Sequence, residues 1–234
     1  MELFRGTKNT KQMNKAFILA NGEFPRREEA LQALLQADTV VCCDGAYNKL
    51  LESQIFTRAS SLPQVFVVGD GDSLGSIEPP FPTTFVEGYT DQETNDLTKA
   101  VKYAVSLGVE RLVILGATGL REDHTLGNIS LLATYARMVT ASGALLTVRM
   151  YTDYGYFTPL TTTATLPSFA RQQVSLFSLD EGLALSVSGL KYPIDGRRLH
   201  YWWEASLNEA LGDSFTVTLD GPGTVLVYQT HDAK

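Results

Sequence analysis

The sequence predicts an α/β protein in which a parallel sheet is followed by a compact antiparallel sandwich or barrel. Two observations support this prediction. Up to about residue 143, short apolar runs alternate with helical patterns, which is typical of a parallel sheet covered on both faces. Beyond that point apolar and polar residues alternate with a period of two, which indicates antiparallel strands.

The first half contains five apolar runs that read as strands, each followed by a helical pattern or a polar loop. In one helical segment, Leu97, Val101 and Ala104 share a face, and Gly108 ends the pattern. The expected strands are 15–20, 39–43, 64–68, 83–88 and 111–115, and the expected helices are 26–37, 44–53, 95–108 and 129–139.

The second half contains five alternating runs separated by turn residues, at 145–152, 170–179, 183–190, 214–219 and 224–230. Turn signals fall at 158–160, 179–182, 188–193, 193–196 and 219–223, and the last of these predicts a hairpin. The expected organisation is therefore a polar extension at 1–14, an α/β domain at 15–143 and a β-sandwich domain at 144–234.

Composition limits the class of partner. The 234-residue chain is 44% apolar with a net charge of −7, which argues against nucleic acid or an anionic membrane as the main partner. No apolar run approaches the ~20 residues of a membrane span. The polar start lacks the apolar core of a secretory signal, so we expect a cytoplasmic protein. Cys42 and Cys43 are expected in a buried strand, not in a disulfide.

Polar residues follow every predicted strand of the first half. They include Asn21, Asp44, the pair Asp70 and Asp72, the segment 91–96 and the segment 116–124. Because the carboxyl ends of parallel strands meet at one edge of a sheet, we expect these groups to gather there.

Four carboxylates at one edge require a cation or solvent, since two unit charges 4 Å apart repel by ~4 kcal/mol at an effective dielectric constant near 20. Oxygen ligands without His or Cys pairs favour Mg²⁺, and helix N-termini at the same edge favour anions. The pattern therefore indicates a site for a metal–polyphosphate. Taken singly, each residue also has a structural interpretation. Asp96 suits the first turn of a helix, Arg121 suits a surface pair with Glu122 or Asp123, and His124 suits a structural hydrogen bond.

Five motifs resemble the thiamine pyrophosphokinase family in order and spacing: DGAYNKL, VVGDGDSL, DQETNDLTKA, GATGLREDHTLGN and GLKYPIDG. The resemblance extends from about residue 15 to 228. It implies a homodimer with a Rossmann-like catalytic domain, a β-sandwich domain for thiamine binding and dimerisation, and an active site between subunits. The implied reaction converts ATP and thiamine to AMP and thiamine diphosphate with Mg²⁺.

The resemblance also implies roles for particular residues. Asp70, Asp72 and Asp96, with Asp44 close by, match metal-binding positions, and Asp70 and Asp96 are alternative acceptors of the hydroxyl proton. With Arg121, the first three form the expected catalytic set. The residues expected to bind ATP are Asn21, Asp44, Gln92, Thr94, Lys99, Arg121, Asp123 and His124.

Thiamine is expected near the end of the second domain, at Trp202, Trp203, Ser206, Asn208 and Tyr228. Here the chain departs from the family. Leu207 replaces the usual serine of a Ser-Asn pair, Ser206 is the candidate to supply the missing hydroxyl, and Asn95 stands where threonine is common. Two other functions stay open: another Mg²⁺-dependent phosphoryl or nucleotidyl transferase, and a non-catalytic module that senses nucleotide or thiamine.

Overall fold

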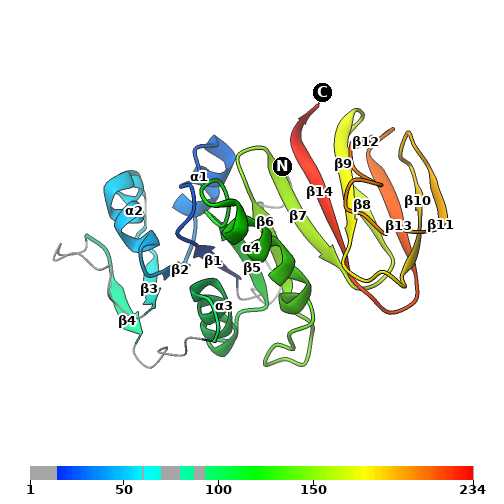
Figure 1. Cartoon of the computed structure of the whole chain (residues 1–234). Helices are drawn as coiled ribbons and strands as arrows, with labels where there is room; N and C mark the ends of the chain where they lie inside the picture. Colours follow the sequence, from blue (N-terminus) through cyan, green and yellow to red (C-terminus); the bar gives the residue numbers. More distant parts are fainter. Residues whose placement is uncertain (1–14, 60, 70–79, 87–92, 234) are drawn as a thin grey trace. The chain divides into compact units, whose positions relative to one another are not determined.

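A computed structural model describes residues 15–59, 61–69, 80–86 and 93–233 (Figure 1). The chain divides into two compact units. A parallel unit contains the residues up to 128 together with 139–147, and an antiparallel unit contains 129–138 and the residues from 148 onward. The expected extension at 1–14 lies outside the described residues.

Five strands of the parallel unit run in the order β5-β1-β2-β3-β4. All four pairings between neighbours in this order are parallel, so the carboxyl ends of the strands share one edge, as the sequence predicts. The strands are β1 (Lys15–Leu19), β2 (Thr39–Cys43), β3 (Gln64–Val68), β4 (Thr83–Val86) and β5 (Arg111–Leu115).

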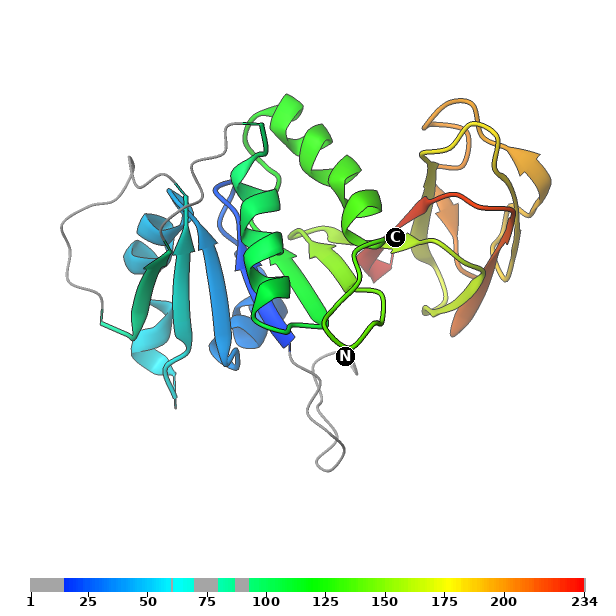
Figure 2. The same ribbon diagram turned by 90° about the horizontal axis from the view of Figure 1, so that it is seen from below.

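Helices cover both faces of this sheet. Figure 2 shows α3 (Asp96–Ser106) on one face, with α1 (Glu28–Leu35) and α2 (Ala46–Ser53) on the other. The chain runs from β1 through β4 in one direction and then returns through α3 to β5. Crossovers between parallel strands are right-handed almost without exception, so a return of this kind puts α3 on the opposite face from α1 and α2. The topological switch point of the sheet therefore lies between β1 and β5, where open α/β sheets bind ligands.

The fourth helix, α4 (Glu122–Tyr135), begins seven residues earlier than its apolar pattern predicts. Its first turn carries Glu122 and Asp123, and acidic side chains stabilise a helix N-terminus. The Asp123 carboxylate also accepts the backbone N–H of His124 at 2.9 Å. Asp123 and His124 therefore lie on a helix, whereas the sequence motif reads as a loop.

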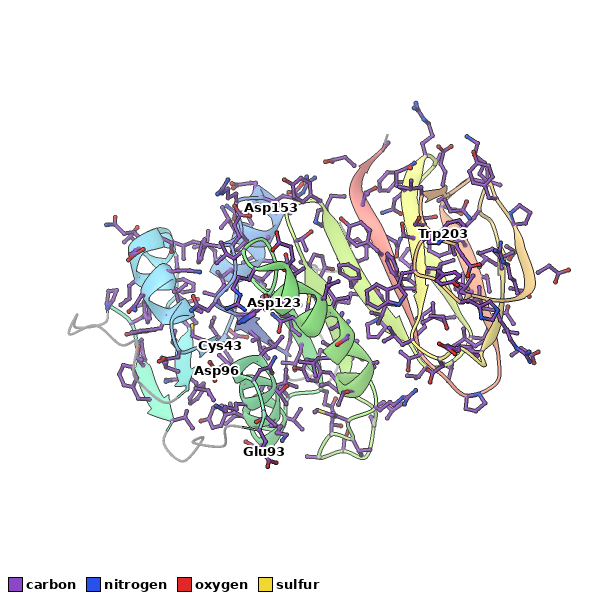
Figure 3. The ribbon with its side chains drawn as sticks, in the orientation of Figure 1. Cys43, Glu93, Asp96, Asp123, Asp153 and Trp203 are labelled. Carbon is purple, nitrogen blue, oxygen red and sulfur yellow. The ribbon has the colours of Figure 1, made fainter. Side chains whose placement is uncertain are left out.

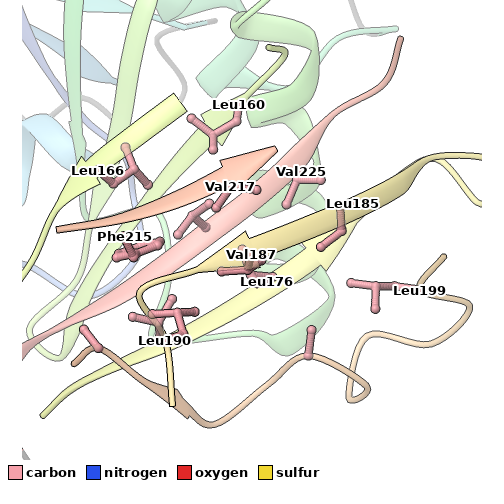
Figure 4. Close-up of a cluster of buried hydrophobic side chains, with 14 of the residues drawn as sticks. Leu160, Leu166, Leu176, Leu185, Val187, Leu190, Leu199, Phe215, Val217 and Val225 are labelled. Carbon is pink, nitrogen blue, oxygen red and sulfur yellow. The ribbon is translucent and has the colours of Figure 1, made fainter. Parts of the chain in front are cut away.

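The antiparallel unit contains two sets of strands. One has the order β12-β9-β14-β7-β6 and the other β11-β10-β13-β8. The bounds are β6 (Thr147–Tyr151), β7 (Gly155–Leu160), β8 (Ala164–Pro167), β9 (Gln172–Ser178), β10 (Ala184–Ser188), β11 (Ile194–Arg198), β12 (Asn208–Glu209), β13 (Ser214–Asp220) and β14 (Val225–Ala233). Leu176 and Val225 from the first set meet Leu185 and Phe215 from the second in one buried core (Figure 4). The second half is therefore the predicted sandwich.

Three turn predictions in this unit differ from the structure. The segment 219–223 does not close a hairpin, because β13 pairs with β10 and β8 whereas β14 pairs with β7 and β9. It carries the chain from one sheet to the other, so Val217 and Val225 enter the same core from opposite sides. The segment 158–160 lies inside β7. Pro159 pairs with Leu226 of β14, whereas the pairing of β6 with β7 is at residues 156 and 157. Proline is tolerated in a strand where one side has no ladder partner.

The segment 193–196 is a third such difference, because Ile194 to Gly196 belong to β11. Cys42 and Cys43 are buried and free in β2, as predicted. No helix in the described part of the chain is long and apolar enough to cross a membrane.

Candidate active site

Glycines let the side chains at successive strand ends lie against the next strand. The side chain of Asn21, after β1, covers Gly45, where any Cβ would overlap its amide nitrogen. Asp44, after β2, lies against Gly69 in the same way, because a Cβ there would come within 2.5 Å of the Asp44 Cβ. The ends of β1, β2 and β3 are therefore in contact, and two of the predicted polar residues lie at that edge.

The loops after β1 and β5 meet at the switch point. The N–H of Gly22 donates to the Gly116 carbonyl at 2.6 Å, and the N–H of Glu23 donates to the Thr118 carbonyl at 2.8 Å. Lys49 of α2 donates to the carbonyls of Asn21 and Gly22 at 2.8 and 2.6 Å. Sequence reasoning did not identify Lys49, although it lies within the DGAYNKL motif.

A buried cation lies at the start of α3. Lys99 is only 7% exposed, and its Nζ is 3.1 Å from Oδ1 of Asp96, whose side chain is half exposed. Burial is the largest cause that raises the pKa of the Cys43 thiol. The charges of Asp96 and Asp44 raise it further. Figure 3 labels Cys43 and Asp96 close together in this unit. The α3 start therefore brings one carboxylate and one ammonium group to the end of β2.

Thr94 and Asn95 lie directly before this helix, and Thr94 is half-buried. Asn95 is the N-cap of α3, because its side chain accepts the N–H of Thr98 at 2.9 Å. Three predicted site residues, Asp70, Asp72 and Gln92, lie outside the described residues.

The residues present suit a magnesium ion in their donor chemistry. Asp44 and Asp96 supply the carboxylate oxygens that Mg²⁺ prefers. Within the described ranges, no group of three or more His, Cys, Asp or Glu side chains is arranged to hold a metal ion. Asp70 follows Gly69 directly in the sequence, and Gly69 lies against Asp44.

Arg121 and Asp123 form an ion pair with two hydrogen bonds, Nε to Oδ1 at 3.1 Å and Nη2 to Oδ2. Both side chains are more than half exposed. The bonds from Arg121 lower the pKa of Asp123, and the N–H of His124 contributes in the same direction. The surface pair that the sequence allowed is therefore present, and both groups remain accessible to a ligand.

Asn128, in the same motif, is a second residue that the sequence reading did not single out. Its Nδ2 donates to the Ala117 carbonyl at 2.8 Å, and its Oδ1 accepts from Nδ2 of Asn95 at 3.2 Å. A single side chain on α4 thus contacts both the loop after β5 and the residue before α3.

In the antiparallel unit, the segment 199–207 carries Trp202 and Trp203, two of the residues predicted to bind thiamine. Trp203 is labelled in Figure 3. Trp203 is 72% exposed and Trp202 41%. Glu204 accepts the N–H groups of His200 and Tyr201 and pairs with Arg197 at 3.0 Å. The bond from Tyr201 is the largest cause of its lowered pKa. One carboxylate therefore holds the loop that presents both tryptophans.

The other predicted thiamine residues take part in packing and hydrogen bonds within this unit. Asn208 is 3% exposed, and its amide bonds to both backbone groups of Tyr192 and to the N–H of Glu209. Ser206 donates to the Trp203 carbonyl at 2.8 Å. Tyr228 begins a row of rings across β14, β7 and β9, in which successive centroids of Tyr228, Phe157, Phe177 and Trp202 lie 4.7, 6.3 and 5.8 Å apart.

These features define a two-unit α/β enzyme class, with charged and amide groups at the carboxyl edge of a parallel sheet and an aromatic loop on a β-sandwich. Two family models match the chain: the thiamin pyrophosphokinase catalytic domain over residues 30–141, and the thiamin pyrophosphokinase substrate-binding domain over residues 155–228. The chain belongs to the thiamin pyrophosphokinase family, whose members are enzymes.

Solved structures share the fold. A thiamin pyrophosphokinase family protein from Enterococcus faecalis is 23% identical with a TM-score of 0.71, and the match covers 94% of this chain and 100% of that one. The thiamin pyrophosphokinase of Candida albicans is 17% identical with a TM-score of 0.71, covering 96% and 95%. The yeast enzyme is 17% identical with a TM-score of 0.72, covering 97% and 89%. No sequence among the curated proteins matches significantly.

Proposed function

We propose that the protein transfers the pyrophosphoryl group of ATP to the primary hydroxyl of thiamine, giving thiamine diphosphate and AMP. The observation that supports this best is the buried Lys99 beside Asp96 at the α3 start, in a family whose name specifies this transfer. A buried ammonium group stabilises phosphate charge more strongly than an exposed one, because water does not screen it.

In the proposed step, the thiamine oxygen bonds to the β-phosphorus while the bond from that phosphorus to the α,β-bridging oxygen breaks. AMP leaves with that oxygen, and Asp70 or Asp96 accepts the hydroxyl proton. Lys99 and Arg121 stabilise the phosphate charge, while Asn21, Gln92, Thr94, Asp123 and His124 position the nucleotide. Catalysis then comes mainly from positioning and electrostatics.

Mg²⁺, when bound, neutralises phosphate oxygens. Asp44, Asp70, Asp72 and Asp96 would hold it, two of them within the described residues and two outside.

We assign thiamine to the loop around Trp202 and Trp203, with Ser206, Asn208 and Tyr228 as the other residues of its binding site. The exposed Trp203 ring suits a cationic thiazolium, because aromatic faces attract cations. The contacts of Asn208 support a role in shaping this region, since its amide holds the turn at Tyr192. The proposal also includes a homodimer with the active site at the subunit interface, in the cytoplasm.

The test is incubation with ATP, Mg²⁺ and thiamine, followed by chromatography of the products. Equal amounts of AMP and thiamine diphosphate are expected. ADP or free pyrophosphate would instead indicate another transferase, and binding without turnover would indicate a sensing module.

Asp72→Asn tests the metal assignment, and Asp38→Asn is its matched control because Asp38 is an exposed carboxylate at the opposite edge of the same sheet. We expect the first variant to lose most of its turnover and the second to keep it. A near wild-type rate for Asp72→Asn at saturating Mg²⁺ would contradict the assignment.

A further inference from the structure

Asn95 uses both ends of its amide. Its oxygen caps α3 by accepting the N–H of Thr98 at 2.9 Å, and its nitrogen donates to Oδ1 of Asn128 at 3.2 Å. Serine, threonine and aspartate cap helices about as well as asparagine does. Aspartate carries no donor, and in serine and threonine one hydroxyl oxygen would have to serve both bonds. Asparagine accepts and donates through two separate atoms, and this distinguishes Asn95 from the other capping residues.

Asn128 also uses both ends of its amide. Besides accepting from Asn95, it donates to the Ala117 carbonyl at 2.8 Å in a half-buried bond. Ala117 belongs to the loop after β5, and His124 lies one turn before Asn128 on the same side of α4. Through the side-chain amides of Asn95 and Asn128, hydrogen bonds therefore connect the start of α3 to the loop and helix that follow β5.

We propose that Asn95 and Asn128 form an amide clamp that positions Asp96 and Lys99 relative to residues 117–124 for binding of the ATP phosphates. Both are positioning residues, because they act through neighbouring groups. This inference rests on the proposed function for its ligand. A misplacement of about 1 Å can cost about 100-fold in rate, whereas the bond between the two amides is exposed and a hydrogen bond contributes only about 1 kcal/mol to stability. The clamp should therefore affect nucleotide use more than unfolding.

The clamp predicts a coupled effect in a double-mutant cycle. Asn95→Thr keeps a capping oxygen and removes the amide donor, and Asn128→Ala removes the other half of the clamp. We expect each variant to lower kcat/KM for ATP by about 10-fold, with the KM for thiamine and the Tm of Asn95→Thr unchanged. The double variant should be no worse than the poorer single one.

Lys102→Met, at an exposed position of α3, is the control and should match the wild type. Independent, multiplicative losses would overturn the clamp, as would wild-type kcat/KM in Asn95→Thr.

Hydrogen exchange of the free protein tests the clamp without any turnover. Each single variant should speed exchange of the amides in both 96–99 and 117–121, because either substitution breaks the same connection. Faster exchange confined to the mutated element would refute the clamp. If the wild type forms no thiamine diphosphate, the proposed function fails, and the exchange result alone then supports or refutes the clamp.

Discussion

In the parallel unit the candidate residues follow the ends of different strands, whereas in the antiparallel unit most of them lie on one short loop. Asn21, Asp44 and Asp96 come together because parallel pairing places their strand ends and helix start at one edge. Trp202 and Trp203 are held instead by Glu204, through its bonds to His200 and Tyr201.

This difference shows two ways of building a site. Topology positions the first, so single substitutions there should change chemistry more than structure. Local hydrogen bonds position the second, so a single carboxylate should control it.

The largest effect is expected in the antiparallel core. Leu185 is fully buried where the two sets of strands meet. Leu185→Ala should lower the free energy of unfolding by about 2–5 kcal/mol, because it removes buried surface and leaves a cavity. Denaturant unfolding monitored by tryptophan fluorescence measures this loss. Leu211→Ala, at a side chain that is 63% exposed, should change it by less than about 0.5 kcal/mol.

The second prediction concerns the parallel unit. Asp96→Asn should reduce turnover by about 100-fold, equivalent to ~2.7 kcal/mol of transition-state stabilisation. The substitution keeps the shape of the side chain but removes the charge that pairs with the buried Lys99 ammonium group, so the Tm should fall as well, by less than the loss of activity would suggest. Steady-state kinetics with Asp38→Asn alongside is the measurement. A large drop in Tm with unchanged kcat would show that Asp96 serves only the fold.

The third prediction tests Glu204 through pH. Its folded pKa is lowered, chiefly by the N–H of Tyr201, so its stabilising bonds are present above the usual glutamate pKa. They are lost as the pH falls through the lower, folded value. The chain has two tryptophans, and both lie on this loop. Their fluorescence should therefore change as the pH falls below about 4.5, and Glu204→Gln should show the acid-form spectrum already at pH 7. Identical titrations in the two proteins would argue against control by Glu204.

The smallest structural effect is expected at Arg121. Its pair with Asp123 is exposed on both sides, and exposed pairs contribute little to stability. Arg121→Gln should leave the Tm unchanged while raising the KM for ATP several-fold, since a guanidinium binds phosphate through paired hydrogen bonds. Arg26→Gln, which breaks the exposed pair with Glu23, is the control and should change neither value. A fall in Tm for Arg121→Gln alone would assign the pair to the fold.

Much of the fold could be predicted from the sequence, because apolar periodicity follows burial. The five parallel strands and the helix at 96–106 match their predicted patterns closely. The start of α4 could not be predicted from that pattern, since residues 122–128 have no apolar face and are stabilised by acidic residues at the helix N-terminus. The passage of the chain from one sheet to the other at 219–223 could not be predicted either. A turn sequence does not reveal whether its flanking strands pair with each other or lie in opposite sheets.

The candidate site was predictable in its residue types and less so in its contacts. Asp44 was predicted from its place after an apolar strand and Lys99 from the family resemblance, and both are buried. Lys49 and Asn128 act through backbone carbonyls and a second amide, and nothing in their sequence neighbourhood identifies those partners. Asn208 was predicted to bind thiamine. In the structure its side-chain amide bonds to the backbone of Tyr192 and Glu209.

The central claim is that groups gathered at the carboxyl edge of the parallel sheet bind ATP. Calorimetry with Mg²⁺ and an ATP analogue carrying a methylene bridge between the α- and β-phosphorus tests it most directly, since the analogue binds but does not transfer. The account predicts tight binding to the wild type and to Lys102→Met, and binding at least about 10-fold weaker to Lys99→Met, because a buried charge opposite phosphate is lost. Equal affinity in all three proteins would contradict it.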